Sequence, residues 1–257
     1  LVEDYGVGYI KMDYNIEPGI GTEINAENPG DGLLGHERAY LSWLDEIFAK
    51  YPDLVIENCS SGGLRIDYAM LSRYSIQSTS DQEDFMAYAT VSANAAAALT
   101  PEQAAVWSYP MTEADKETVI FNMVNAMLLR IHQSGHLVKM QGERFDLIKE
   151  AIDYYKTIRE DIKKALPFWP LGLAGYHDAW LAFGLKTEEK MYVAVWRRSG
   201  SENTKTIRLP LDGHAAAVRC AYPANEPADF KWQPQTGELT VTLDRAPQAR
   251  LFEVTLR

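Results

Sequence analysis

The stretch VGYIKMDYN, residues 7–15, decides how the rest of the chain is interpreted. It passes from apolar residues to Lys11, Asp13 and Asn15 at alternate positions. In an extended strand, residues two apart point to the same side, so these polar side chains are expected on one face, where a buried strand opens into a loop. Such groups are costly to bury unless something binds them, and β/α proteins place their chemistry at this end of the strands. The stretch therefore predicts an active-site strand, with an ordinary strand that ends in polar residues as the alternative.

The same order of strand, polar strand end and helix repeats as far as residue 166. Further strands are expected at residues 54–56, 75–79, 104–109 and 130–136. Apolar residues at helical spacing predict helices at 40–51, 64–73, 85–99, 119–128 and 145–166, and the glycine-rich segment 17–35 is expected to be a long loop. This alternation indicates a parallel sheet with right-handed crossovers.

After the stiff aromatic segment Pro167-Phe168-Trp169-Pro170, short alternating or apolar runs separated by turn residues predict an antiparallel all-β module. Its strands are expected at residues 180–185, 191–196, 204–209, 218–222, 238–243 and 251–256. We therefore expect an α/β plus all-β fold with two domains. Residues 1–166 form the C-terminal portion of a (β/α)8 TIM barrel, about strands 4 to 8, and residues 167–257 form an antiparallel β-sandwich. A complete barrel takes about 250 residues, so the first barrel strands are expected to lie upstream of Leu1.

The composition narrows the classes of partner. The chain has 257 residues and a formal net charge of -11, with no basic run, so we expect no nucleic-acid binding. No apolar run reaches the length that spans a bilayer, so we expect no membrane insertion. Cys59 and Cys220 give neither a disulfide framework nor a metal-binding spacing, which favours a cytoplasmic protein without a metal or other cofactor.

Two carboxylates end different predicted strands, Asp13 the first and Asp81 the third. Paired carboxylates across a cleft are what glycoside hydrolysis requires, because one attacks the anomeric carbon and the other protonates the leaving oxygen. Lys11 beside Asp13 favours an ionised nucleophile. The alternative is that both are solvated acidic residues of loops, which any α/β protein has.

Three motifs in this order resemble the strand-end motifs of glycoside hydrolase family 36 α-galactosidases. They are YIKMDYN at 9–15, CSSGGLRID at 59–67 and STSDQED at 78–84, against family patterns KWDMN, CSSGGGR and SDNTD. The resemblance extends over essentially the whole chain, including the long terminal helix and the β-sandwich. It implies the C-terminal part of a retaining enzyme that releases terminal α-linked galactose from oligosaccharides such as raffinose.

The resemblance also implies a role for particular residues. Asp13 is implied to be the nucleophile and Asp81 the acid/base. The expected substrate-binding residues are Lys11, Asn15, Cys59, Gly62 and Gly63; buried packing is the alternative for Cys59. The resemblance further implies an α-galactoside oligosaccharide as substrate and a homo-oligomer in the full-length parent. Galactose-binding residues of earlier strands lie outside this chain, so we expect the isolated chain to be inactive or nearly so.

Departures from the family patterns leave other functions open. Met12, Tyr14, Leu64, Gln82 and Glu83 replace family residues, which puts the sugar specificity in doubt. One alternative is an α-N-acetylgalactosaminidase of the same family. A Schiff-base lyase that uses Lys11 is another enzyme class, and a non-catalytic carbohydrate-binding module at 172–257 is a third possibility. The alternative to such a module is a purely structural role, in which the β-sandwich caps the barrel.

Other polar residues are interpreted as structural. His132 and His136 are expected to line a pocket or to pack rather than to bind a metal, because Gly135 between them disfavours a helix. Arg65 and Asp67 are expected to form an ion pair, and Arg197 and Arg198 a solvated strand end.

Overall fold

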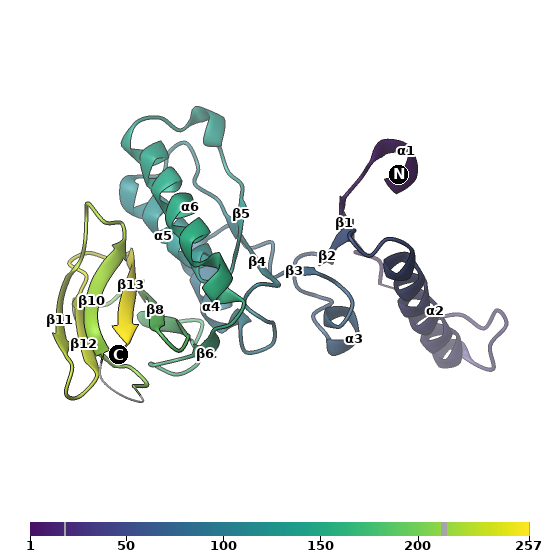
Figure 1. Ribbon diagram of the computed structural model, residues 1–257. Coiled ribbons are helices and arrows are strands. Elements are labelled where there is room, and N and C mark those ends of the chain that lie inside the picture. The colour runs from purple at the N-terminus through teal and green to yellow at the C-terminus, as the bar shows by residue number, and fades with distance from the viewer. Residues whose placement is uncertain (18, 212–214, 257) are drawn as a thin grey trace. The chain divides into compact units, whose positions relative to one another are not determined.

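The structure, a computed structural model, describes residues 1–17, 19–211 and 215–256. The chain forms two compact units, residues 1–79 and 80–257. Figure 1 labels the elements along the chain.

The first unit is a short parallel sheet with helices on one face. Its elements are α1 (Val2–Tyr5), β1 (Tyr9–Asp13), α2 (Pro29–Lys50), β2 (Val55–Cys59), α3 (Tyr68–Leu71) and β3 (Ile76–Ser78). The strands run parallel in the order β1, β2, β3, with Asp13 beside Cys59 and Glu57 beside Ile76. The expected parallel sheet is therefore present.

The helix-covered face of this sheet holds the apolar core of the unit. Ile56 of β2 packs with Leu44 of α2, and Ile10 and Met12 of β1 pack against the same cluster. Because alternate residues of a strand point to opposite sides, Lys11 and Asp13 face away from the helices. The expectation of a fully buried strand is wrong for this face, where Lys11 and Asp13 are exposed, and in the described residues β1 forms the edge of the sheet.

Helix α2 begins earlier than its apolar spacing predicts, so the predicted loop 17–35 is wrong from Pro29 onward. The Asn28 side chain accepts a hydrogen bond from the Asp31 N–H at 3.0 Å, and Pro29 occupies the first helical position, where a missing N–H costs nothing. A Cβ at Gly32 would collide with the Thr22 carbonyl oxygen, so this glycine permits a close approach of backbone.

The predicted helix 64–73 is the short α3, because Asp67 caps its N-terminus at 3.0 Å from the Met70 nitrogen.

The second unit opens with parallel strands and their helices. Its first elements are α4 (Phe85–Ala95), β4 (Ala104–Ser108), α5 (Lys116–Met127), β5 (Arg130–Gln133), the 3-10 helix η1 (Leu137–Lys139) and α6 (Glu143–Ile162). Strands β4 and β5 run parallel, with Trp107 beside His132. Aspartates cap α4 and α5, as Asp84 accepts from the Met86 N–H and Asp115 from the Thr118 N–H.

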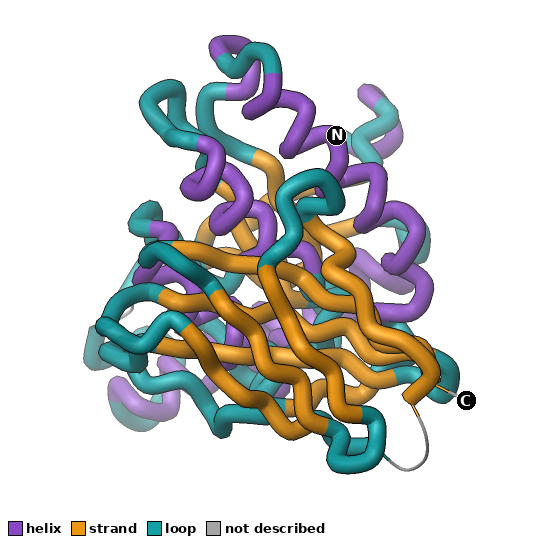
Figure 2. The backbone as a smooth tube through the Cα atoms, turned by 90° about the vertical axis from the view of Figure 1, so that its left-hand side faces the viewer, coloured by secondary structure: helices purple, strands orange, loops and turns teal. Residues whose placement is uncertain are grey.

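Two antiparallel sheets complete this unit. Their strands are β6 (Leu166–Phe168), β7 (Trp180–Lys186), β8 (Lys190–Arg197), β9 (Thr204–Arg208), β10 (Ala215–Tyr222), β11 (Asp229–Gln233), β12 (Glu238–Thr242) and β13 (Gln248–Leu256). The larger sheet has the order β10-β13-β8-β7-β6 and the smaller one β11-β12-β9, and Figure 2 shows their strands side by side. The antiparallel module that the sequence predicts is therefore present.

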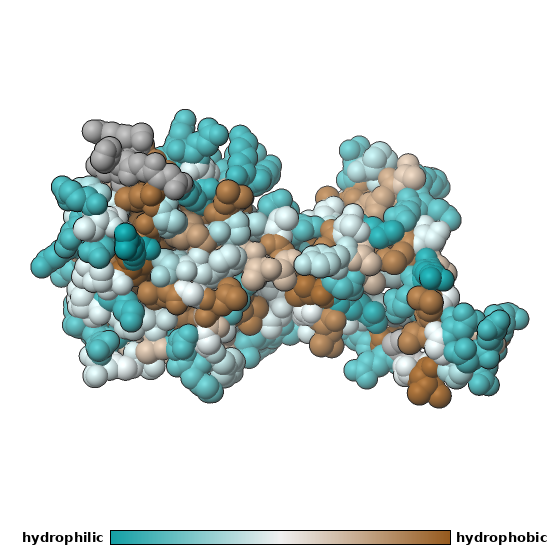
Figure 3. Space-filling view, turned by 90° about the horizontal axis from the view of Figure 1, so that it is seen from below, coloured by the Kyte–Doolittle hydropathy of each residue, from teal (hydrophilic) through white to brown (hydrophobic). Residues whose placement is uncertain are grey.

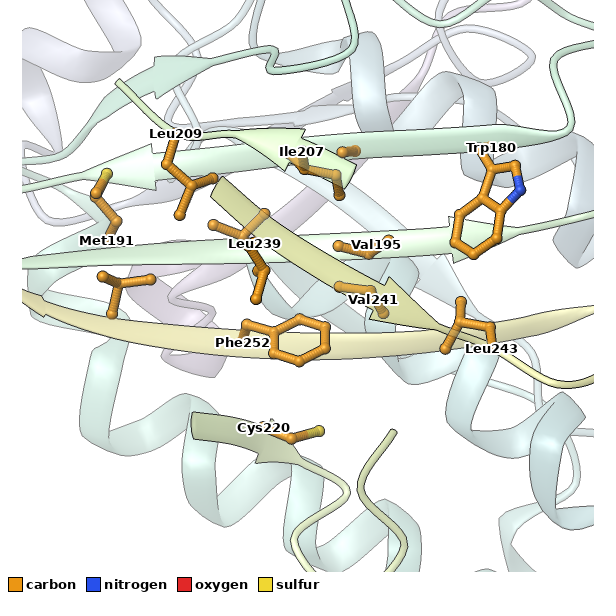
Figure 4. Packing of buried hydrophobic residues seen from close by; sticks show 13 residues of the cluster. Trp180, Met191, Val195, Ile207, Leu209, Cys220, Leu239, Val241, Leu243 and Phe252 are labelled. Atoms are coloured by element: carbon orange, nitrogen blue, oxygen red, sulfur yellow. The ribbon is translucent and has the colours of Figure 1, made fainter. Parts of the chain in front are cut away.

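One apolar core joins the two antiparallel sheets. Val195 and Phe252 of the larger sheet pack with Ile207, Leu239 and Val241 of the smaller one, and all five side chains are fully buried (Figure 4). Alternate inward-pointing residues on both sheets account for this packing.

The segment before the larger antiparallel sheet differs from the sequence-based expectation. The segment expected to be a stiff linker contains β6, in which Pro167 lies beside Leu185 of β7. As β6 is the end strand of its sheet, the missing N–H of Pro167 is tolerated there.

Arg197 and Arg198 are not a solvated strand end. Arg197 is buried and donates to the carbonyl oxygens of Leu243 and Gly200, and Arg198 donates to Thr90 of α4 at 2.8 Å.

Helices α5 and α6 pack beside the larger antiparallel sheet (Figure 1). Glu117 of α5 accepts two hydrogen bonds from Arg250 of β13, at 2.7 and 2.8 Å, and both side chains are buried. Tyr154 of α6 donates to Glu253 of β13 at 2.6 Å. The predicted division of domains at residues 166 and 167 lies inside this second unit, and it stays a prediction.

Among the described residues, no helix is both long enough and apolar enough to cross a membrane. Figure 3 shows one face of the molecule, on which hydrophilic residues cover much of the area and hydrophobic ones lie between them. Both cysteines, Cys59 and Cys220, are free thiols and buried.

Candidate active site

The helix-free face of the first sheet gathers polar side chains from neighbouring strands. Lys11 lies beside Glu57 and Asp13 beside Cys59 in the parallel register of β1 and β2, so the four residues share one face. The sharing of a face by Lys11 and Asp13, predicted from their spacing, is confirmed. The register adds Cys59 to that face, and it adds Glu57, which the sequence interpretation did not select.

Lys11 and Glu57 form an ion pair across the two strands. The Lys11 Nζ lies 3.8 Å from Glu57 Oε1, and the Tyr9 hydroxyl donates a hydrogen bond to Glu57 Oε2. The Glu57 side chain is 1% exposed, whereas that of Lys11 is 31% exposed. The carboxylate is thus an internal anchor, and the ammonium reaches the accessible side of the pair.

Cys59 is the last residue of β2 and lies beside Asp13 in the sheet. Its side chain is fully buried, and its thiol is hydrogen-bonded with Ser78 of β3. Burial raises the pKa of the Cys59 thiol, so the thiol is neutral near pH 7. Cys59 is therefore a neutral, well-packed group that supports the face on which Asp13 lies.

A tight turn after β2 is attached to the end of β1. The Asn15 side chain accepts a hydrogen bond from the Ser61 N–H at 2.7 Å, and the Ser60 hydroxyl donates to the Tyr14 carbonyl oxygen at 2.5 Å. Gly62 has a φ of 80°, which favours glycine. A Cβ on Gly63 would lie 2.6 Å from the Thr79 carbonyl oxygen, so only glycine fits there. Asn15, Gly62 and Gly63 are therefore brought together in one turn beside Asp13.

Arg65 continues this arrangement. Its guanidinium lies over the Tyr14 ring, 4.0 Å from the centroid, and its Nε donates to the Tyr14 carbonyl oxygen at 3.1 Å. Its carboxylate partner is Glu37 at 3.9 Å, and Asp67 instead caps α3. The predicted ion pair between Arg65 and Asp67 is therefore wrong, and Arg65 holds the end of β1 in place.

Asp81 belongs to the second unit, where it lies exposed in a loop before α4. On either side of it the backbone is fixed by hydrogen bonds. The Ser80 hydroxyl accepts from the Gln82 N–H at 3.1 Å, and the Gln82 side chain accepts from the Asp84 N–H at 2.9 Å. The buried hydroxyl of Tyr88 donates to the Ser80 carbonyl oxygen and accepts from the Trp107 N–H, at 3.2 Å in each case. Tyr88 thus joins the Asp81 loop to β4.

Aromatic side chains follow at the ends of β4 and β5. The Trp107 ring stacks on Tyr109 at 6.3 Å and meets His132 edge-on at 5.0 Å. His136 instead contacts Thr112, with Nδ1 2.9 Å from the hydroxyl. Within the described part of the chain, no group of His, Cys, Asp and Glu side chains has the arrangement of a metal site.

The family model described as Melibiase matches residues 1–165, which is more than half of the chain of 257 residues. This chain belongs to the melibiase family. The match takes in all of the residues described above, from the end of β1 to the aromatic residues of β5.

Curated and solved relatives agree with this family. The chain is 23% identical over 203 residues to α-galactosidase Mel36A of Lactobacillus acidophilus, a match that covers 76% of the chain and 27% of that protein. The resemblance to glycoside hydrolase family 36 that the motifs indicate is confirmed.

Among solved structures, the galactosidase domain of the α-galactosidase–sucrose kinase AgaSK superposes with a TM-score of 0.73 at 20% identity, over 99% of this chain and 35% of that one. A variant of α-galactosidase AgaA of Geobacillus stearothermophilus, solved in complex with raffinose, gives a TM-score of 0.73 at 17% identity, over 96% of this chain and 35% of that one. These likenesses show the fold. The chain spans about a third of the length of these relatives.

The sequence does not single out three residues that the structure does: Glu57 in the first unit, and Tyr88 and Trp107 in the second. Glu57 carried a signal, because a charged residue within a short apolar strand is costly to bury without a partner. Because strand residues alternate between faces, the Trp107 side chain lies on the other face of β4 from those of Val106 and Ser108, and this alternation is visible in the sequence. Nothing in the sequence points to Tyr88, whose role depends on the packing of α4.

Proposed function

We propose that this chain supplies the two catalytic carboxylates of a retaining α-galactosidase, with Asp13 as nucleophile and Asp81 as acid/base. The observation that supports this proposal most is the shared face of β1 and β2, on which Asp13 lies on the same side as Lys11 and beside Cys59. A carboxylate with an ammonium group beside it, at the carboxyl end of a parallel strand, is the arrangement expected of a glycosidase nucleophile.

The proposed reaction has two steps. A carboxylate oxygen of Asp13 attacks the anomeric carbon of the galactose while Asp81 protonates the departing glycosidic oxygen, which gives a covalent galactosyl-enzyme. Asp81, now ionised, then takes a proton from a water molecule that displaces Asp13, and the product keeps the α configuration.

The remaining predicted site residues bind the sugar in this proposal. Lys11 donates hydrogen bonds to sugar hydroxyls, because its ammonium lies on the accessible side of its pair with Glu57. Gly62 and Gly63 bring their backbone close to the sugar. Cys59 ends β2 just before this turn, and Asn15 holds the turn through its hydrogen bond with Ser61.

The finer fold assignments are part of the same proposal. Strands β1 to β5 correspond to about strands 4 to 8 of a (β/α)8 barrel in residues 1–166, and residues 167–257 form a β-sandwich domain. The substrate is an α-galactoside oligosaccharide, and the full-length protein is a cytoplasmic homo-oligomer. The alternative Schiff-base lyase finds less support, because Lys11 is ion-paired with a buried carboxylate rather than placed in an apolar pocket.

The test uses the full-length protein that contains this chain. Asp13→Asn should lower kcat by about 10³-fold or more on every α-galactoside, because the covalent step is lost. Asp81→Asn should lower kcat by about 10²- to 10⁴-fold on raffinose and by less on a nitrophenyl galactoside, whose leaving group needs little protonation.

Asp45→Asn is a matched control, because Asp45 binds Arg73 on the surface of the first unit and should leave both rates unchanged. Wild-type rates from Asp13→Asn would end the nucleophile assignment. Faster hydrolysis of the N-acetylated nitrophenyl substrate by the wild-type protein would favour the α-N-acetylgalactosaminidase alternative.

A further inference from the structure

The aromatic side chains at the ends of β4 and β5 lie on the face of those strands that the helices leave uncovered. Val106 and Ser108 are fully buried, and the Ser108 hydroxyl lies 3.2 Å from the Met123 sulfur of α5. Because strand residues alternate, Trp107 points to the opposite face, where it is half-buried. Trp107 is thus placed where a (β/α)8 barrel holds its substrate rather than among the helices.

The three rings of Trp107, Tyr109 and His132 form one ordered surface. The planes of Trp107 and Tyr109 are 25° from parallel, and His132 meets the indole at 80°. His132 lies directly beside Trp107 in the register of β4 and β5, so the indole is held by a neighbouring strand as well as by its own. A ring fixed in this way binds a flat apolar face at a low cost in side-chain entropy.

This surface is attached to the loop of Asp81. The Tyr88 hydroxyl accepts from the Trp107 N–H and donates to the carbonyl oxygen of Ser80, the residue before Asp81. Tyr88 is 1% exposed, so this bridge is internal and fixes both backbone segments. The backbone that carries the aromatic surface and the backbone of the Asp81 loop are therefore held at a fixed distance within the second unit.

The chemistry of the acid/base then indicates what the aromatic surface touches. A residue that protonates the glycosidic oxygen must lie on the side of the departing group. An aromatic ring whose backbone is bridged to the loop of that residue is placed to meet the departing group rather than the galactose. Sugars carry C–H groups on one face of the ring, and an indole is the broadest apolar surface that a side chain offers to them.

We propose that Trp107, supported by Tyr109 and His132, binds the leaving-group sugar of an α-galactoside oligosaccharide and so selects oligosaccharides over substrates with small leaving groups. This inference rests on the proposed function. It assigns the specificity for the departing sugar to β4 and β5, whereas the galactose is bound at the ends of β1 and β2.

The test compares two substrates of the full-length protein, raffinose and α-galactosyl fluoride, which differ in having a sugar or a single atom as leaving group. Trp107→Ala should lower the ratio of kcat/KM for raffinose to kcat/KM for the fluoride by about three- to tenfold, since aromatic stacking contributes on this order. The ratio does not depend on how much of the variant is folded. Trp107→Phe should recover part of the loss, and Trp232→Ala, which alters a half-buried indole of β11, should leave the ratio unchanged.

An unchanged ratio in Trp107→Ala would overturn the inference and assign Trp107 to packing alone. The failure of the proposed function looks different, because the wild-type protein would then hydrolyse neither raffinose nor the fluoride.

Discussion

Glu57 is a carboxylate inside a sheet, and its partners explain why it is tolerated there. An unpaired ionised carboxylate is among the costliest groups to bury, but Glu57 has the Lys11 ammonium at 3.8 Å and a hydrogen bond from Tyr9. The pair crosses two strands, so the long Lys11 side chain is held in one direction beside Asp13. Glu57 is therefore a positioning residue, and its effect on the reaction passes through Lys11.

Glu57→Gln keeps the shape of the side chain and removes its charge. We expect kcat/KM for a nitrophenyl α-galactoside to fall by about tenfold, which is about 1.4 kcal/mol, because the Lys11 ammonium loses the buried charge 3.8 Å away that holds it beside Asp13. The measurement is steady-state kinetics of the full-length protein. Glu37→Gln is the control, since Glu37 pairs with Arg65 rather than with Lys11. A wild-type kcat/KM in Glu57→Gln would contradict the positioning role.

At the scale of elements, aspartates hold the helices that follow the strand ends. Asp115 begins α5, and its side chain accepts a hydrogen bond from the Thr118 N–H at 2.8 Å. That hydrogen bond lowers the pKa of Asp115, and the group is a good cap only while it is ionised. Because the pKa is lower in the folded state, the stability from this cap is present above the unfolded pKa and is lost as the pH falls through the folded pKa.

Asp115→Ala should lower the free energy of unfolding by about 1 kcal/mol at pH 7. Asp115→Asn should cost a few tenths of a kcal/mol, since asparagine also caps well. The difference between the wild type and Asp115→Asn should shrink below about pH 4, where the aspartate becomes protonated. Urea unfolding of the variants at pH 7 and pH 3 gives these values. A stability difference that grows on acidification would show that the expected direction of the pH dependence is wrong.

The strands that sequence patterns predict well are those that are buried along nearly their whole length, because a short apolar run between turn residues marks them. Strands β7 and β8 were expected at 180–185 and 191–196, and both lie within a residue or two of those bounds. The start of α2 was missed because Gly30, Gly32 and Gly35 indicate a loop, and the contact that requires Gly32 is made by a residue outside the helix. Strand β11 is not among the expected strands, and none of its residues is fully buried.

The residues of the candidate site also differ in how far the sequence predicts their positions. The shared face of Lys11 and Asp13 follows from spacing alone, because strand parity depends only on the sequence. Cys59 and Glu57 join that face through register, which the sequence does not give. Tyr88 bridges two loops through a helix, and such a contact arises only from tertiary packing.

For the molecule as a whole, the buried pair of Glu117 and Arg250 is the main polar link between the helices of the second unit and its antiparallel sheet. It is bidentate, and Arg245 adds a further cation 3.7 Å from the same carboxylate. Removing Arg250 leaves the buried Glu117 carboxylate with only the exposed Arg245 and the Gln248 amide near it, and the loss of the bidentate partner costs more than the pair contributes.

Arg250→Met should therefore lower the free energy of unfolding by about 3–5 kcal/mol. The double variant Glu117→Leu with Arg250→Met should recover much of that loss, because no buried charge remains. Lys149→Met removes an exposed pair with Asp153 and should cost about 0.5 kcal/mol or less. Urea unfolding followed by circular dichroism checks all three. Equal losses in the single and double variants would contradict this account.

The link between α5 and β13 has a practical consequence for dissecting the protein. The sequence suggests residue 166 as a place to separate a catalytic piece from a C-terminal piece. A cut there would strip the cover from α5, expose its apolar surface and leave Glu117 without Arg250. Such a truncation is expected to yield insoluble material, whereas nicking the exposed turn at 199–201 should leave both halves associated. A protease trimming this protein should therefore stop at surface turns rather than at the predicted domain boundary.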